Sequence, residues 1–475
     1  AQWLQAARAL LPADAWTRDY ARALDLHNAL AESCFMCGDH GGVSAAADAV
    51  TRHARGALDK VRAFESLLRD AAGRDELEET VRIGLRCLAE LGERFPEAPS
   101  MLHVAGALVQ VKAALVGRDI DALADAPELT DPRRVAALYL MERIAPAAFR
   151  TGSKLFPLLI LRLVLLSVRY GCKPVSSFGY GGYALTLCGV MGDIDGGTRV
   201  GRMTLRLAER FGDDRYRGSA RSVFEMFLRH WTAPLRDSYA PLVEAWALGL
   251  KTGRVFEAAW AGCYLAQWMF LAGAPLPEVV ATLDRYAESN ARDEGARRMA
   301  RLLRQVIANL QGEAATPWRL RGAHYDDAAE LDRLSRTPDK TELAFLRTWR
   351  LLLALLFDRA GEALTEAEEA EKHLEALTSM PMDPVLRWYA ALARLAAARE
   401  GIVARASAVR SARKTAAKLQ TWAGHSPVNY AHKRLLLEAE AARTAGEASA
   451  RALYEQAIAA ARRSGFLHEE ALALE

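Results

Sequence analysis

Two cysteines and two histidines near the start of the sequence have the residue types of a metal or redox site. Cys34 and Cys37 stand three apart in CFMCGDHGG, and His40 and His53 follow. A closed zinc site needs four ligands and usually draws them from two spaced pairs, but the sequence has no second CxxC and no HxxxH. Because free cysteine is among the most buried residue types, we expect both thiols to face the interior of a helix pair and to bind no metal.

Two further segments have partial motifs. GDIDGGTR, at 192–199, has the alternating aspartates of a calcium loop, but Thr198 stands where that loop needs glycine and Thr204 where it needs glutamate. A helix turn capped by aspartate is the better prediction. GYGGY, at 179–183, lacks the ending of a phosphate loop, and the sequence holds no GxSxG, HExxH or kinase motif. We therefore expect no catalytic residue and no cofactor, and a chain that is not an enzyme.

The densest group of polar and aromatic side chains lies at 167–189, between apolar helices, and Arg162 stands just before it. Cations and tyrosines on an otherwise apolar array could line a groove for a ligand or a partner. The sequence leaves open an alternative, which is tight helix packing through the glycines with the tyrosine hydroxyls satisfied internally. The candidate groove residues are Arg162, Arg169, Tyr170, Lys173, Ser176, Tyr180 and Tyr183.

Composition and periodicity predict helix along the whole chain of 475 residues. Alanine, leucine and arginine are abundant, β-branched residues are sparse, and apolar positions recur every three or four residues. Glycine followed by a charged residue ends many of these segments, as a left-handed C-terminal residue does. The expected turns are Gly38-Asp39, Gly73-Arg74, Gly117-Arg118, Gly192-Asp193, Gly253-Arg254, Gly361-Glu362 and Gly446-Glu447.

The first two turns are 35 residues apart, close to the period of tetratricopeptide repeats, which consist of paired antiparallel helices. We predict helices over 19–37 and 42–57 as one pair, and over 61–72 and 75–91 as the next. Later turns are spaced less regularly. Near the other end, one stretch has small and aromatic residues where the second helix of a repeat packs, namely Ala448, Tyr454, Ala457 and Ala461.

These patterns predict an all-α fold, a degenerate tetratricopeptide-like α-solenoid in which antiparallel helix pairs stack into a superhelix. The segment 312–340, with proline, glycine and mixed charge, is expected to be a bend or boundary between a helical array at 1–311 and another at 341–475. Stacked repeats leave an extended concave surface, which such proteins commonly use for binding.

Charge narrows the classes of partner. The chain has 62 basic and 59 acidic residues, a balance too even for a nucleic-acid or membrane-surface protein. The most apolar run, 155–168, is short for a bilayer and carries an arginine, so we expect a buried core helix. An acidic tract at 365–375 and a basic tract at 399–418 are best explained as solvated helix faces, although docking of partner domains stays open.

The cysteines indicate the cellular compartment of the protein, and the chain ends indicate whether the sequence is part of a longer polypeptide. The six cysteines show no paired framework, which indicates reduced thiols and a cytoplasmic protein. The start of the given sequence leads us to expect no signal peptide. It begins in the amphipathic AQWLQAARALL and ends in HEEALALE, and both ends look cut from a longer polypeptide.

Several stretches, taken in order, carry a resemblance to a known family. They are LLPADAWTRDYARALDLHNALAESCFMCGD, RCLAELGERFPEAP, LTDPRRVAALYLMERIAPAAFRTGSKLFPLLILRLVLLSVRYGCKPVSSFGYGGYALTLCGVMGD, RLAERFGDDRYRGSARSVFEMFLRHWTAPLRDS, LGLKTGRVFEAAW and TWAGHSPVNYAHKRLLLEAEAARTAGEASARALYEQAIAAARRSGFLHEEALALE. Their order, with the blocks HW..PL and SPVNYAHK, resembles the tetratricopeptide-like helical region of large bacterial and fungal signalling proteins. Those proteins join a serine/threonine kinase-like domain, a predicted AAA/STAND ATPase and a sensor histidine kinase.

The resemblance implies a function without catalysis. In that family the nucleotide-binding and phosphotransfer motifs lie in flanking domains, so no catalytic residue is carried over to this chain. The expectation is a regulatory or sensory scaffold that binds a ligand, a partner protein or the neighbouring ATPase and kinase domains on its concave face. The alternative is the inducer-sensing repeat arm of an ATPase-type transcription activator.

Overall fold

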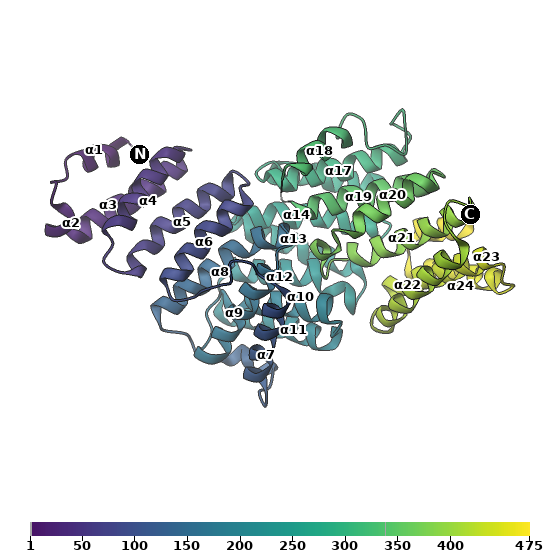
Figure 1. Cartoon of the computed structure of the whole chain (residues 1–475), viewed down its shortest axis with the longest axis horizontal. Helices are drawn as coiled ribbons and strands as arrows, with labels where there is room; N and C mark the ends of the chain where they lie inside the picture. Colours follow the sequence, from purple (N-terminus) through teal and green to yellow (C-terminus); the bar gives the residue numbers. More distant parts are fainter. Residues whose placement is uncertain (1, 338) are drawn as a thin grey trace. The chain divides into compact units, whose positions relative to one another are not determined.

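The structure, a computed structural model, describes residues 2–337 and 339–475, so Ala1 and Pro338 lie outside the described residues. Over the described ranges the chain forms helices and two isolated β-bridges but no strand, which confirms the all-α prediction. It divides into two compact units, Ala1–Gly179 and Tyr180–Glu475. Within each unit, helices adjacent in sequence pack against each other, an arrangement consistent with an α-solenoid (Figure 1).

The first unit holds the helices up to the start of α10. They are α1 (Gln2–Ala9), α2 (Ala15–Arg18), α3 (Tyr20–Met36), α4 (His40–His53), α5 (Ala57–Gly73), α6 (Leu77–Glu90), α7 (Met101–Leu115), the 3₁₀ helix η1 (Asp121–Asp125), α8 (Pro132–Arg150) and α9 (Leu155–Tyr170). The helices α3 to α6 match the two predicted N-terminal pairs to within a few residues at each end.

The second unit takes up the rest, and α10 (Ser176–Thr186) crosses the division. The helices after α10 are η2 (Leu187–Met191), α11 (Ile194–Phe211), α12 (Asp214–Phe227), η3 (Arg229–Trp231), η4 (Leu235–Ser238), α13 (Tyr239–Lys251), α14 (Val255–Leu271), α15 (Leu276–Arg285), α16 (Ala287–Asn290), α17 (Glu294–Leu310), α18 (Asp327–Ser335), α19 (Lys340–Leu356), α20 (Ala360–Glu371), η5 (Leu374–Leu377), α21 (Met382–Arg399), α22 (Arg405–His425), α23 (Pro427–Ala445), α24 (Ala450–Ser464) and α25 (Leu467–Leu474).

Five of the seven predicted glycine turns have the left-handed backbone that ends a helix. They are at Gly38, Gly117, Gly192, Gly253 and Gly446. The other two predictions are wrong in detail, because Gly73 is the last residue of α5 and Gly361 lies in the first turn of α20. There the positive φ falls on Asp75 (59°) and Asp358 (55°). Aspartate is one of the few residues with a side chain that tolerate this conformation.

Aspartate also starts many of the helices. The Asp193 carboxylate accepts a hydrogen bond from the Gly196 backbone N–H at 2.9 Å and caps α11. Such a bond satisfies one of the amides that the first helical turn leaves unpaired. The segment that partly matched a calcium loop is therefore a capped helix turn, as predicted. The same bond from an aspartate begins α4, α8, α12, α17, α18 and α19.

The core of the first unit centres on α9. Its side chains from Leu158 to Val168 are buried at every position except Arg162, which confirms the predicted buried helix. Helices α7 and α8 pack on it, and α6 packs on α8. Across the described ranges, no helix combines the length and the apolar character that a bilayer crossing requires.

In the second unit, alternate helices form a continuous layer. Helices α14, α17, α19, α21 and α23 contact one another in that order, while α20, α22 and α24 each pack between two of their sequence neighbours. Segment 312–340 lies inside this unit and includes α18. Its loop is fixed to α17, because the Asn309 amide donates to the carbonyl oxygens of Pro317 (2.8 Å) and Arg319 (2.5 Å).

The predicted C-terminal repeat helix is α24. Ala457 and Ala461 are buried on it, as predicted, and Tyr454 is half-buried with its hydroxyl bonded to Glu440 on α23. Ala448 is the exception, because it is exposed in the turn before the helix begins. The left-handed residue at Gly446 ends α23 two residues earlier, which places Ala448 outside either helix.

Candidate functional site

Four of the candidate groove residues lie on the surface of the first unit, and most of these four already have partners. The Arg162 guanidinium donates to the Glu93 carboxylate at 2.5 Å, and Lys173 forms an ion pair with Glu128. Tyr170 lies beneath another guanidinium, since the Cζ atom of Arg134 is 3.8 Å from its ring centre. Arg169, next in sequence to Tyr170, is exposed.

The other three candidates, Ser176, Tyr180 and Tyr183, are buried. Ser176 accepts a hydrogen bond from the Ser167 hydroxyl at 2.8 Å, on α9. The glycines beside the tyrosines permit close packing, because a Cβ at Gly179 would lie 2.1 Å from a methyl carbon of Leu163. The burial of these three residues agrees with the packing part of the alternative, which is close helix packing through the glycines. A groove of the predicted kind would be lined by the four surface residues alone.

The two cysteines of CFMCGDHGG have different surroundings. Cys34 is fully buried in a core cluster with Leu30, Val43 and other residues of α3 and α4, as predicted. Cys37 is exposed, so the prediction that both thiols face the interior is wrong for this residue. It follows the last residue of α3, where the chain has already turned toward Gly38. Nowhere among the described residues do three or more His, Cys, Asp or Glu side chains gather as a metal site would require.

The two sequence blocks that are most specific in the resemblance meet inside the second unit. The Asn429 amide, from SPVNYAHK, donates at 2.8 Å to the carbonyl oxygens of His230 and Ala233 in HW..PL, and its oxygen accepts from the Leu235 backbone N–H at 3.1 Å. The Tyr430 hydroxyl bonds to the His230 ring. Segments about 200 residues apart in sequence are thus joined by buried hydrogen bonds.

Ser379 adds a third segment to this buried cluster. Its hydroxyl accepts from the Trp231 indole N–H at 2.9 Å and donates to the Phe227 carbonyl oxygen at 2.8 Å. Its own carbonyl oxygen lies 2.9 Å from His230 Nε2. Ser379 has a φ of 62°, which is rare for a residue with a side chain, and this backbone conformation directs both groups into the cluster. Since the hydroxyl already serves a carbonyl oxygen and an indole, it is not arranged as a nucleophile.

The protonation of His230 follows from its partners. A carbonyl oxygen can only accept, so Nε2 carries the proton and Nδ1 accepts from the Tyr430 hydroxyl. Complete burial lowers the pKa of His230 to about 4. Burial also raises the pKa of Tyr430 well above its usual value. Both groups are therefore neutral at physiological pH within this buried cluster.

The last two residues of SPVNYAHK hold the C-terminal helix. Lys433 donates to both carboxylate oxygens of Glu469 on α25, at 2.6 and 2.8 Å, and His432 Nε2 lies 2.6 Å from the same carboxylate. Burial and the adjacent Lys433 ammonium lower the pKa of His432 to about 4. Burial opposes ionisation of Glu469, but Lys433 and His432 hold the pKa of that carboxyl well below its usual value. This is a buried ion pair that fixes α25 on α23.

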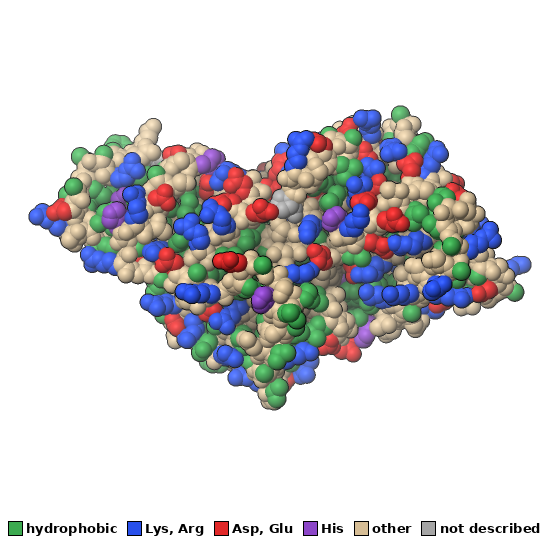
Figure 2. Space-filling model, in the orientation of Figure 1, with side chains coloured by type: hydrophobic (Ala, Val, Ile, Leu, Met, Phe, Trp, Pro, Cys, Tyr) green, Lys and Arg blue, Asp and Glu red, His purple; other side chains and the backbone are tan. Residues whose placement is uncertain are grey.

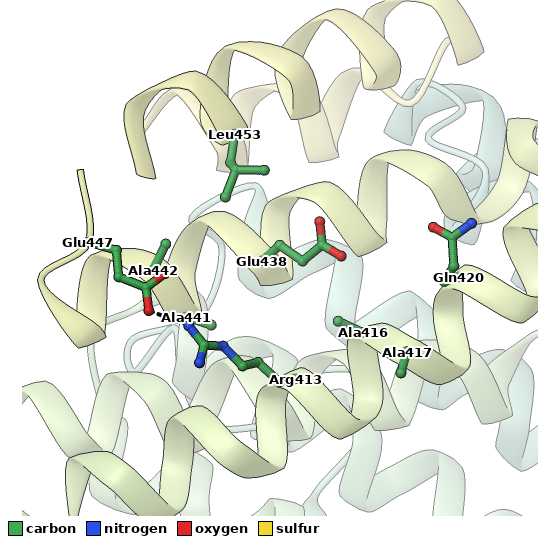
Figure 3. A pocket seen from close by; sticks show the side chains of 9 residues that line it. All are labelled: Arg413, Ala416, Ala417, Gln420, Glu438, Ala441, Ala442, Glu447 and Leu453. Atoms are coloured by element: carbon green, nitrogen blue, oxygen red, sulfur yellow. Dashed lines mark hydrogen bonds and ion pairs between the residues drawn. The ribbon is translucent and has the colours of Figure 1, made fainter. Parts of the chain in front are cut away.

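A surface cavity of about 420 Å³ lies on helices α22 to α24 (Figure 3). We call it the α22–α24 groove. Five alanine and leucine side chains form the apolar part of its lining, which we call its floor, and the other four lining side chains are polar. Arg413 forms an ion pair with Glu447, and Glu438, in the middle of the lining, pairs with Arg434. The nine lining residues are Arg413, Ala416, Ala417, Gln420, Glu438, Ala441, Ala442, Glu447 and Leu453.

None of the groove residues was a sequence candidate. Alanines on helices usually indicate packing, so the floor gives no sequence signal that separates it from a core. The only available hint was the basic tract at 399–418, which supplies three of the lining residues. The sequence of this tract favours a solvated helix face.

Comparison of the chain with protein-family models, with curated proteins and with solved structures finds no match.

Proposed function

We propose that this chain is a non-catalytic, tetratricopeptide-like scaffold that regulates a multidomain cytoplasmic signalling protein of the ATPase or kinase type. It binds a ligand, a partner protein or a neighbouring domain along the helical array. The ligand or partner must bind two states of the parent protein unequally, because only a difference in affinity shifts an equilibrium between them.

The observation that carries this proposal is the meeting of HW..PL with SPVNYAHK. These blocks set the resemblance apart from loose repeat similarity, and Asn429, Tyr430, His230 and Ser379 join them in one buried cluster. Proteins that share this helical architecture would be expected to share the residues that hold its distant helices together. The stack of helices, with a groove on its surface, supports binding as the use of that architecture.

The test begins with the isolated chain and with the natural polypeptide that contains it. We expect the isolated chain to hydrolyse no ATP and to phosphorylate no protein, and the natural polypeptide to do at least one of these. Removal of the helical array should change the rate of that reaction without abolishing nucleotide binding. A natural polypeptide with neither activity would refute the proposal, and one that instead binds DNA specifically would favour the transcription-activator alternative.

An enzymatic role for the chain itself is tested by the same preparation. Of the residues that could support such a role, Tyr180 is buried, while Arg169 is exposed. Turnover of a substrate by the isolated chain that disappears in Tyr180→Phe or Arg169→Ala would overturn the assignment as a scaffold.

A further inference from the structure

The acidic and the basic tract differ in how completely the fold neutralises them. The acidic tract at 365–375, on α20 and η5, has most of its carboxylates in ion pairs. These pairs join Glu366 to Arg347 and Arg350, Glu369 to Lys372, Glu371 to Arg394 and Glu375 to Lys340. Most of the negative charge of this tract is therefore neutralised by ion pairs within the second unit.

The basic tract at 399–418 keeps much of its charge. Arg399 pairs with Glu440 and Arg413 with Glu447. The Lys418 ammonium lies over the Trp422 ring, 5.3 Å from its centre. Three more cations of the tract are exposed and form no ion pair with any residue that the structure describes: Arg405, Arg410 and Lys414. All three lie on α22.

These cations border the α22–α24 groove. Residues three or four apart share a face of a helix, so Arg410 extends the face on which Arg413, Ala417 and Gln420 line the groove. Lys414, four residues after Arg410, lies beside it on the exposed surface of α22. In Figure 2, Lys and Arg side chains gather along α22. The apolar floor thus lies beside exposed cations of α22 that lack anionic partners, while the two carboxylates of the groove lining, Glu438 and Glu447, are already paired with Arg434 and Arg413.

We propose that α22 and the α22–α24 groove bind an acidic, amphipathic segment of a partner protein. Carboxylates of that segment pair with Arg410 and Lys414, and its small apolar side chains pack on Ala416, Ala417 and Leu453. The inference rests on the proposed scaffold function and names the chemistry of one partner.

A protein segment fits these features better than a nucleic acid. Proteins that bind single strands combine cations with aromatic side chains on which bases stack, and the nine lining residues include no aromatic. The net charge of +3 is also small for a nucleic-acid partner. The floor can bury methyl groups, which a peptide supplies and a phosphate backbone does not.

The contact should be weak and sensitive to salt. Exposed ion pairs contribute little each, and ions screen them over about 8 Å at physiological ionic strength. Affinity then depends on several carboxylates acting together with the apolar floor, so both parts of the surface can be tested separately.

The probe is a fluorescent synthetic peptide of about 15 residues, long enough to form a helix, with glutamate on one face and alanine and leucine on the other. It is titrated into the full chain at low and at physiological salt. We expect the charge reversal Arg410→Glu with Lys414→Glu to weaken binding about tenfold or more. Ala417 lines the groove and is exposed, so the large side chain of Ala417→Trp should occupy the groove and also weaken peptide binding. Arg202→Glu is the matched control, because Arg202 is an exposed, unpaired cation within α11, and it should leave the affinity unchanged.

The outcomes separate the possible explanations. Equal binding of a peptide with glutamine in place of glutamate, or unchanged affinity of the double variant, would overturn the proposal. It would also fail if an oligonucleotide or an anionic lipid vesicle bound more tightly than the peptide and Ala417→Trp had no effect. Because the titration uses this chain alone, its result is independent of whether the natural polypeptide has ATPase or kinase activity.

Discussion

Acidification should destabilise the second unit through His230. The ring is fully buried and neutral, with a pKa of about 4 against 6.5 for an ordinary histidine. A histidine whose pKa is lowered by folding takes up its proton more readily in the unfolded chain. Its contribution to stability is therefore complete above about pH 6.5 and is lost as the pH falls toward 4.

The magnitude follows from the two pKa values. The gap between 6.5 and about 4 corresponds to about 3 kcal/mol when the pH lies below both values, and about 2 kcal/mol of this is lost between pH 7.5 and pH 5. His432, Glu469 and other groups also titrate in acid, so the decisive quantity is a difference between variants. His230→Gln keeps an amide donor for the Ser379 carbonyl oxygen and an acceptor for Tyr430, but it cannot take up a proton in this range.

The assay is urea unfolding, followed by the fluorescence of the buried tryptophans, at a series of pH values between 7.5 and 5. We expect His230→Gln to be less stable than the unsubstituted protein at pH 7.5 and the gap to narrow by about 2 kcal/mol at pH 5. His324→Gln is the control in the same unit, because the hydrogen bonds of His324 are made by its backbone. A gap that stays constant over this pH range would refute the argument from burial.

Three further predictions follow from individual positions. Gly106 lies in the exposed middle of α7, where an added Cβ meets open space, so Gly106→Ala should stabilise the first unit by about 0.5–1 kcal/mol. At Gly84 an added Cβ would lie 2.2 Å from a buried methyl carbon, so Gly84→Ala should destabilise the unit by about 1–3 kcal/mol. Urea unfolding measures both changes. Lys433→Met, which leaves the Glu469 carboxylate buried without its ammonium partner, should cost about 3–5 kcal/mol, and adding Glu469→Leu should restore much of the loss in the same assay. A thiol reagent should label Cys37 rapidly in the native protein and the five buried thiols only after unfolding, so rapid labelling of a second cysteine would contradict the burial described for it.

Local features of the fold could be predicted from the sequence because local chemistry determines them. Asp39 and Asp193 begin helices in the way that their position after glycine suggests, and the apolar run at 155–168 is a buried helix. Even the errors are local. At Gly73 and Gly361 a nearby aspartate takes the left-handed conformation, and glycine composition alone does not reveal that choice.

The candidate site could not be predicted in this way because it depends on contacts between distant segments. The sequence gives no sign that Asn429 donates to the carbonyl oxygen of His230, or that Ser379 joins both. Burial likewise separates Tyr180 from Arg169, although both stand in one polar stretch. The two charged tracts look equivalent in sequence, and only the positions of the opposing charges show that one is neutralised and the other is not.

The cluster around Asn429 also bears on how the second unit is made. Contacts of such long sequence separation carry a cost in loop-closure entropy, and the hydrogen bonds from Asn429 to the segment near 230 can form only once the chain beyond 429 is available. During synthesis, the carbonyl oxygens of His230 and Ala233 stay without the Asn429 amide until that segment emerges. A polypeptide cut within 312–340 would therefore yield two pieces that each lack half of a shared interior, and neither should reach the native arrangement without the other.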